Sequence, residues 1–210
     1  MADQKKYFRA VLGECRASLA PEFARASSIA IQRRLLAADC YRAARIVVLY
    51  SSIQNEIATT MVAADAIASG KEVLFPRLCR DGAAMAMVQV RHLSEMVPGA
   101  HGILEPPADG EIVAPADLAG AIVLVPGLAF GPQGQRLGRG GGHYDRFIAA
   151  LPREAITVGL AYSFQLLDGI PQESHDRRLH YIITESALIR AFEPPVHAHA
   201  EEAGRGGIPG

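Results

Sequence analysis

The sequence predicts an α/β fold in which helices cover both faces of one mostly parallel sheet. Short apolar runs typical of buried strands alternate with segments of helical periodicity, and this alternation favours parallel strands joined by helices. Half of the 210 residues are hydrophobic, which at this length is enough for one well-filled core. We therefore expect a single domain.

Two helices are predicted ahead of the first strand. Residues Gln4–Leu19 repeat apolar side chains at helical spacing. The apolar positions form two neighbouring stripes: Tyr7, Val11 and Cys15, and Phe8, Leu12 and Leu19. The second helix covers Pro21–Ala38, since proline is favoured at the first helical position.

Strands and further helices then alternate along the chain. The predicted strands are Arg45–Tyr50, Glu72–Phe75, Met85–Val90, Ala121–Val125, Thr157–Tyr162 and Tyr181–Thr184. Helices are predicted over Ile57–Ser69, which Gly70 ends, and over Tyr144–Leu151. His92–Pro115 is rich in proline and glycine and is predicted as loop. Because ligands of such sheets bind beyond the carboxyl ends of the strands, we expect the functional site at that edge.

Composition limits the partners. The chain has 21 basic and 22 acidic residues, a formal net charge of −1, which argues against a general nucleic-acid or anionic-membrane binder. No apolar run reaches the roughly 18 residues that span a bilayer, and the first residues lack the apolar core of a signal peptide. Cys15, Cys40 and Cys79 lack metal-binding spacing and are expected to be reduced. We expect a cytoplasmic protein with small-molecule partners and neither nucleic acid nor membrane, a monomer with an oligomer left open.

The composition changes after residue 193. Residues 194–210 are mostly small or flexible and are predicted to be a disordered tail, behind a domain over residues 1–193. Four side chains of metal-binding type lie close together in this tail: His197, His199, Glu201 and Glu202. A solvated tail explains them better than a metal site does.

The most informative segment is the glycine-rich stretch Gly127–Gly142. Seven of its sixteen residues are glycine, against 20 in the whole chain. A strand that enters such a loop and then a helix is typical of phosphate binding, because glycine lets backbone N–H groups approach phosphate oxygens. Arg136, Arg139 and Arg146 add full positive charges. No lysine follows the last glycine, so this is not a Walker A loop, and a surface turn without function is the open alternative.

The motifs over Lys5–Glu185, in this order, resemble those of the 5-formyltetrahydrofolate cyclo-ligase family. They are KxxxR (Lys5–Arg9), a Glu-x-x-Thr element (Glu56–Thr59), GKEVLFP (Gly70–Pro76), GILEP (Gly102–Pro106), VPGLAF (Val125–Phe130), RLGRGGGHYDR (Arg136–Arg146) and IPQESHD (Ile170–Asp176). KxxxR is weak alone, whereas the glycine loop with its YDR is highly specific.

The resemblance implies a Rossmann-like α/β fold and an enzyme that uses ATP and Mg²⁺. In the family, ATP phosphorylates the formyl oxygen of 5-formyltetrahydrofolate. The neighbouring amine then closes the imidazoline ring and phosphate departs, which leaves 5,10-methenyltetrahydrofolate and ADP. Phosphorylation turns a poor leaving group into a good one, so the enzyme must hold the triphosphate near the formyl oxygen.

The resemblance also implies roles for residues of this chain. The ATP-binding residues are Lys5, Arg9, Arg136, Leu137, Gly138, Arg139, Gly140, Gly141, Gly142, His143 and Tyr144. The substrate-binding residues are Arg9, Ser51, Glu56, Arg139, Gly140, Gly141, Gly142 and His143. Arg139 and Lys5 are expected to be catalytic. The magnesium ligands are Asp145, Asp176 and His180, although Mg²⁺ prefers oxygen to imidazole.

Spacing alone leaves simpler interpretations open. Lys5 and Arg9 lie four residues apart on one helix face, and such a face is usually solvated. Glu56 and Asp145 stand near predicted helix starts, where an acid also serves the helix N-terminus. Tyr50 is expected to pack in the core rather than to stack on a ligand ring.

Three positions depart from the usual family pattern: Gly131, His143 and His180. Family members commonly have Asp at the first, Tyr or Phe at the second and Asp at the third. These departures favour, as the alternative function, a non-catalytic nucleotide- or folate-binding paralogue. A kinase-like or sugar-phosphate enzyme on the same fold is a third hypothesis, because fold does not fix function.

Overall fold

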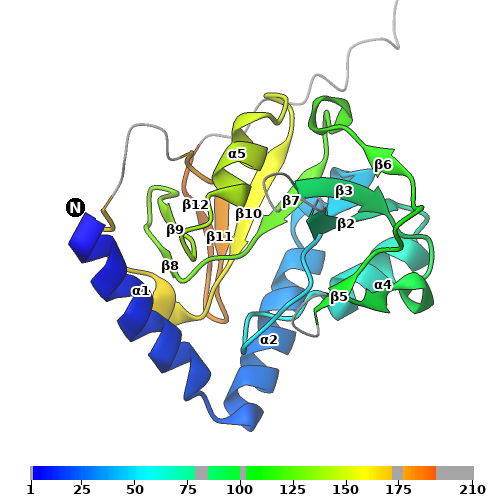
Figure 1. Ribbon diagram of the computed structural model, residues 1–210. Helices are drawn as coiled ribbons and strands as arrows, with labels where there is room; N and C mark the ends of the chain where they lie inside the picture. Colours follow the sequence, from blue (N-terminus) through cyan, green and yellow to red (C-terminus); the bar gives the residue numbers. More distant parts are fainter. Residues whose placement is uncertain (1, 79–84, 100–102, 172–176, 193–210) are drawn as a thin grey trace, which may run out of the picture.

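The computed structural model describes residues 2–78, 85–99, 103–171 and 177–192 (Figure 1). The strands of its central sheet are β1 (Ile46–Val48), β2 (Glu72–Leu78), β3 (Met85–Gln89), β6 (Ile112–Val113), β7 (Ile122–Val125), β10 (Ile156–Leu160), β11 (Tyr181–Ile183) and β12 (Leu188–Arg190). They lie in the order β12-β11-β10-β7-β1-β2-β3-β6. The run from β11 to β2 is parallel, and β12, β3 and β6 add antiparallel edges. The predicted mostly parallel sheet is confirmed.

Helices cover both faces of this sheet, as predicted. They are α1 (Ala2–Ala17), α2 (Pro21–Leu36), α3 (Asp39–Ala43), α4 (Thr60–Ala68) and α5 (His143–Ala149). Side chains alternate along β1, so Val47 packs with Ile31 of α2 and Val62 of α4, whereas Val48 packs on the other face with Phe147 of α5. Each face therefore closes its own apolar cluster.

Helix α1 lies at the rim of the sheet, beside a hairpin of β8 (Ala129–Phe130) and β9 (Arg136–Leu137) (Figure 1). Its Leu12 packs with Leu128 and Leu137 in a third apolar cluster. The stripe of Tyr7, Val11 and Cys15 points outward instead, with Tyr7 66% exposed. The inward face of α1 combines Leu12 with basic side chains, because its neighbours at the rim offer carbonyl and carboxylate oxygens as well as apolar groups.

The irregular regions contain short elements that the sequence pattern did not predict. Between β3 and β7 stand η1 (Leu93–Glu95), β4 (Val97–Pro98), β5 (Leu104–Glu105), β6 and η3 (Pro115–Asp117), and η4 (Ser163–Gln165) follows β10. The predicted loop at His92–Pro115 was therefore wrong where β6 joins the sheet, and β12 follows the strand predicted as last. Strands of two or three residues are too short to show periodicity.

Some predictions fall outside the described residues. These concern Cys79, the tail over residues 194–210 and most of the IPQESHD motif. Cys15 and Cys40 are both free thiols. Within residues 2–78, 85–99, 103–171 and 177–192, we find no helix that is both long and apolar enough to cross a membrane.

Candidate active site

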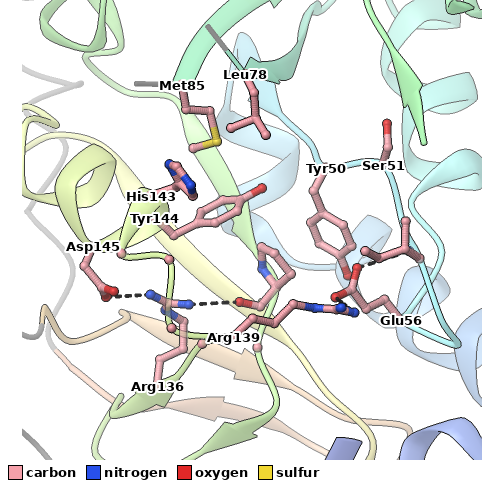
Figure 2. A pocket seen from close by; sticks show the side chains of 17 residues that line it. Tyr50, Ser51, Glu56, Leu78, Met85, Arg136, Arg139, His143, Tyr144 and Asp145 are labelled. Carbon is pink, nitrogen blue, oxygen red and sulfur yellow. Dashed lines mark hydrogen bonds and ion pairs between the residues drawn. The ribbon is translucent and has the colours of Figure 1, made fainter. Parts of the chain in front are cut away.

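A cavity of about 280 Å³ lies at the carboxyl edge of the parallel strands, between the segment after β1 and the residues before α5 (Figure 2). Many residues singled out from the sequence line it: Ser51, Glu56, Arg136, Gly138, Arg139, Gly140, Gly141, Gly142, His143, Tyr144 and Asp145. They come from two segments about 80 residues apart, which the parallel pairing of β1 with β7 brings together. A cavity therefore lies at the edge of the sheet where the functional site was expected, and the roles of its residues stay predictions.

A strained turn between β1 and α4 presents Glu56. Gln54 and Asn55 have φ angles of 48° and 57°, which are uncommon for residues that carry a side chain. The Asn55 amide donates to the Arg16 carbonyl at the end of α1 over 3.1 Å, and the Tyr162 hydroxyl donates to the Asn55 carbonyl over 3.0 Å. Neighbouring elements therefore hold this turn in a conformation that it would not adopt alone.

Two arginines converge on the Glu56 carboxylate. Nη2 of Arg139 lies 3.2 Å from Oε1, and Nη2 of Arg16 lies 3.5 Å from the same oxygen. The second carboxylate oxygen accepts from the N–H of Ile53 over 3.1 Å, and Arg139 also donates to the Gln54 amide oxygen over 2.9 Å. Burial lowers the pKa of Arg16, and the charge of Glu56 opposes that shift. The side chain of Arg139 is 43% exposed and that of Arg16 only 3%, so only Arg139 is open to a ligand arriving from solvent.

The glycine-rich stretch divides into two parts. The first is the hairpin β8–β9, closed by the Gly131 N–H donating to the Gln135 carbonyl over 2.9 Å. The second, residues 138–142, is irregular, lines the cavity and leads into α5. Gly140 and Gly142 have φ angles of 107° and 67°, where a Cβ is disfavoured. The predicted single loop is thus a buried hairpin followed by a short glycine segment.

Arg136 and Asp145 form an ion pair under this glycine segment. Their Nη2 and Oδ1 atoms lie 2.5 Å apart, and the Arg136 side chain is buried. Arg136 also donates to the Pro126 carbonyl over 3.2 Å and places its guanidinium carbon 5.9 Å from the centre of the Tyr144 ring. Burial, reinforced by the charge of Glu56, raises the pKa of Tyr144 far above its ordinary value, so its hydroxyl is neutral. Arg136 and Asp145 therefore neutralise each other within the protein.

Helix α1 brings another cation to the glycine segment. Nε of Arg9 donates to the Gly138 carbonyl over 2.9 Å, and a Cβ on Gly140 would lie 3.4 Å from the Arg9 guanidinium carbon. Lys5, one helical turn earlier, is only 8% exposed and lies on the same side of the helix. The simpler interpretation that spacing left open, a solvated face, is therefore wrong for Lys5. Contact of Lys5 and Arg9 with phosphate stays a prediction.

The remaining wall of the cavity is partly apolar. Figure 2 shows Leu78 and Met85, at facing positions of β2 and β3, above the His143 ring. Ser51 lies on the β1 side, where its hydroxyl donates to the Leu104 carbonyl. Leu78 and Met85 lie outside the quoted motifs, so no sequence pattern indicated that they line the cavity.

The two predicted magnesium ligands that the structure describes, Asp145 and His180, each have another partner. Asp145 is paired with Arg136. His180 stands at the amino end of β11, and its Nδ1 accepts from the backbone N–H of Thr157 over 3.0 Å, while burial lowers its pKa. Asp176 lies outside the described residues. Among the residues that are described, no group of three or more His, Cys, Asp or Glu side chains is placed to hold a metal ion.

Arg16 is a further residue of the site that the sequence analysis missed. A signal was available, because Lys5, Arg9 and Arg16 fall within about 40° of each other around an ideal helix. That basic stripe faces the cavity rim. The helix had been predicted from its apolar positions alone, and the spacing of its basic residues was not considered beyond Lys5 and Arg9.

Known proteins resemble the chain over nearly all of its length. A model of the 5-formyltetrahydrofolate cyclo-ligase family matches residues 1–185. The 5-formyltetrahydrofolate cyclo-ligase of Mus musculus is 26% identical over 191 residues, which cover 87% of this chain and 94% of the mouse protein. The mitochondrial 5-formyltetrahydrofolate cyclo-ligase of Arabidopsis thaliana is 28% identical over 209 residues, which cover 89% of this chain and 76% of the plant protein. The predicted cytoplasmic location stays a prediction, because the plant relative is a mitochondrial protein.

A solved structure has the same fold. The NMR structure of Aquifex aeolicus 5,10-methenyltetrahydrofolate synthetase matches with a TM-score of 0.77 and 28% identity, over 93% of this chain and 99% of that chain. The match to the family model covers both segments that form the cavity. The chain is therefore an enzyme of the 5-formyltetrahydrofolate cyclo-ligase family, a family of ligases in folate one-carbon metabolism.

Proposed function

We propose that the chain converts ATP and 5-formyltetrahydrofolate to ADP, phosphate and 5,10-methenyltetrahydrofolate in this cavity. The observation that carries the proposal is the contact between Arg139 and Glu56, which joins the glycine segment to the turn after β1. These two residues are the cation suited to a phosphate and the carboxylate suited to a pterin. Their contact supports a single cavity in which both substrates meet.

The phosphate end of the cavity is assigned to the glycine segment and the cations beside it. Arg139 is exposed enough to turn toward a ligand, and Arg9 is already bound to the backbone of this segment. Lys5 adds a third charge from α1. Together these cations would balance the charge of the phosphoryl group as it moves from ATP to the formyl oxygen.

The folate end is assigned to Glu56 and the surfaces around it. Its carboxylate would accept paired hydrogen bonds from the amino and ring N–H groups of the pterin. Leu78 and Met85 offer apolar surface, and the imidazole of His143 lies where it can stack or hydrogen-bond. Ser51 lines the same side as Glu56 and is assigned to the substrate with it.

The chemistry needs two steps that balance without a redox partner. The formyl oxygen attacks the γ-phosphorus, its bond to phosphorus forms and ADP leaves. The secondary amine at N10 then attacks the formyl carbon, loses its proton, and phosphate leaves with the former formyl oxygen. Because both substrates are held in one cavity, the transfer does not require a collision between separate molecules. This proximity accelerates the reaction.

The described residues do not fit a magnesium site built by the protein. Asp145 forms an ion pair with Arg136, and Nδ1 of His180 accepts a hydrogen bond from the backbone N–H of Thr157. The proposal therefore assigns the charge of phosphoryl transfer to the chain's own cations, and magnesium dependence is tested separately.

The deciding experiment is the absorbance of 5,10-methenyltetrahydrofolate after the protein is mixed with ATP and 5-formyltetrahydrofolate, with Mg²⁺ present or chelated. We expect absorbance to rise and ADP to form in equal amount, only when both substrates are present. Absence of product at saturating substrates would reject the proposal. ADP formation without folate would favour a kinase-like enzyme instead.

The alternative function is a paralogue that binds nucleotide or folate without turnover. It draws on the three departures from the family pattern, but of these only His143 lines the cavity. Gly131 lies in the hairpin turn and His180 at the amino end of β11. Binding of ligand would raise the melting temperature of such a paralogue, but no product would form.

A further inference from the structure

Arg16 occupies a different position from the other cations of the site. It stands behind Glu56 rather than in the cavity, with its side chain 3% exposed. Its Nη1 donates to the Gly127 carbonyl over 3.2 Å, while its Nη2 faces Glu56 at 3.5 Å. Its backbone carbonyl accepts from Asn55 of the strained turn. One residue thus joins α1, the Glu56 turn and the start of the glycine-rich stretch.

The placement of this charge is costly. Burying a guanidinium removes its hydration, and Nε of Arg16 has no hydrogen-bond partner among the described residues. A salt bridge buried for stability alone is often replaceable by apolar side chains. The buried charge of Arg16 balances the charge of Glu56, whose side chain is only 9% exposed.

The second arginine beside Glu56 is Arg139, and it differs from Arg16 in being accessible to a ligand. Glu56 contacts both Arg16 and Arg139, and only Arg139 has access to solvent. A phosphate that attracts Arg139 would take away one of the two cations around a buried carboxylate. A buried carboxylate without a partner is strongly disfavoured, so without Arg16 the protein would resist this exchange.

We propose that Arg16 is a positioning residue, which holds the Glu56 carboxylate in place when Arg139 exchanges it for the anionic substrate. This inference rests on the function proposed above. Arg16 acts through Glu56 and touches neither substrate. Its removal leaves Glu56 with Arg139 as its guanidinium partner, so both the folate and the phosphate lose a contact.

The test is a double-mutant cycle between positions 16 and 56. Arg16→Gln is expected to raise the KM for 5-formyltetrahydrofolate and for ATP by about tenfold to a hundredfold, the range for one charge-assisted hydrogen bond. The kcat is expected to change by less than about threefold, because the residue is not part of the reacting groups. In a Glu56→Gln background the same change is expected to have no further effect on either KM.

Two further variants separate positioning from general stability. Arg16→Lys keeps the charge but cannot serve Glu56 and Gly127 at once, so we expect a KM only a few-fold above wild type. Arg34→Gln is the matched control, since Arg34 donates to the carbonyls of Thr184 and Glu185 over 3.2 and 3.1 Å, away from the cavity. It is expected to lower the melting temperature and leave both KM values unchanged.

Several results would overturn the inference. They are an unchanged KM in Arg16→Gln, an equally large effect in the Glu56→Gln background, or a lower melting temperature with lower kcat and unchanged KM. If Arg16→Gln does not fold, Arg16→Lys carries the cycle, and its few-fold rise in KM must vanish when Glu56 is Gln.

Failure of the inference can be told from failure of the proposed function. If the wild type forms no product, the proposed function fails. The Kd for 5-formyltetrahydrofolate, measured calorimetrically in the same variants without ATP, then takes the place of KM. A Kd that Arg16→Gln leaves unchanged would reject Arg16 as a positioning residue for folate.

Discussion

At the level of single residues, the proposed reaction depends most on the ion pair between Arg139 and Glu56. Arg139 is 43% exposed, and its other contact is the amide of Gln54, on a turn held under strain. Arg139 is the exposed partner of this pair, and Glu56 keeps Arg16 beside it, so the loss of Arg139 is expected to cost little stability. The value of this arginine therefore lies in what it can bind rather than in holding the fold.

Arg139→Ala is expected to lower kcat/KM by about a hundredfold or more, because the charge of phosphoryl transfer loses its most accessible cation. The melting temperature is expected to shift by only a few degrees. The absorbance assay and thermal unfolding measure the two effects. Arg153→Ala, at an exposed arginine outside the cavity lining, is the control. Unchanged turnover in Arg139→Ala would remove this residue from the site.

His180→Asp is expected to leave the magnesium dependence of turnover unchanged. Position 180 lies at the amino end of β11, where a carboxylate can still accept from the N–H of Thr157. The apparent activation constant for Mg²⁺ checks this, with His92→Asp at an exposed position as the control. An activation constant about tenfold lower in His180→Asp alone would place the metal near position 180 and overturn this expectation.

Short elements define the site more than long ones do. The glycine segment is five residues between β9 and α5, and its path depends on left-handed backbone at Gly140 and Gly142. The sequence predicted the importance of this segment from its glycine content and the family resemblance. It could not predict the hairpin before it, because β8 and β9 have two residues each and are too short to show strand periodicity.

Gly140→Ala is expected to raise the KM for ATP by about tenfold, because a Cβ at a φ of 107° strains the glycine segment by 1 kcal/mol or more and meets the Arg9 guanidinium. Gly13→Ala is the matched control, since Gly13 lies in α1 with no atom within 4 Å of an added Cβ, and it is expected to stabilise the helix slightly. Steady-state kinetics and thermal unfolding of both variants test the difference. An ATP KM in Gly140→Ala equal to that of Gly13→Ala would show that the segment tolerates a side chain there.

At the scale of the whole molecule, the parallel part of the sheet could be predicted from the pattern of apolar residues. The site could not be predicted in full. Each strand of the parallel run had been expected, because short apolar runs are typical of buried strands. The site is assembled from segments distant in sequence, and its ion pairs depend on that assembly. Nothing local indicates that Arg136 faces Asp145 or that Arg16 faces Glu56.

At the scale of the molecule we also expect stability to fall as the pH rises above about 10. Burial raises the pKa of five tyrosines, at positions 41, 50, 144, 162 and 181. Above pH 10 the unfolded chain loses these protons while the folded state keeps them, so the free energy of unfolding decreases. Denaturant unfolding at pH 9 and pH 10.5 measures the decrease.

Tyr41→Phe provides the comparison for this pH effect. Tyr41 donates to Asp65 over 2.6 Å, so the substitution costs some stability at every pH. It is expected to make the decrease from pH 9 to pH 10.5 smaller than in the wild type, because one shifted group is gone. An identical decrease in both proteins would mean that Tyr41 titrates alike in the folded and unfolded states.

The antiparallel strands at the two ends of the sheet have a consequence for the protein in a crowded solution. A long outer strand offers unpaired N–H and carbonyl groups, on which another molecule can add its own strand. Here the outermost strands are β6, with two residues, and β12, with three. Templates this short offer few hydrogen bonds to an incoming chain. The hydrophobic parallel strands, which would aggregate readily if exposed, are thereby kept from edge-to-edge growth between molecules.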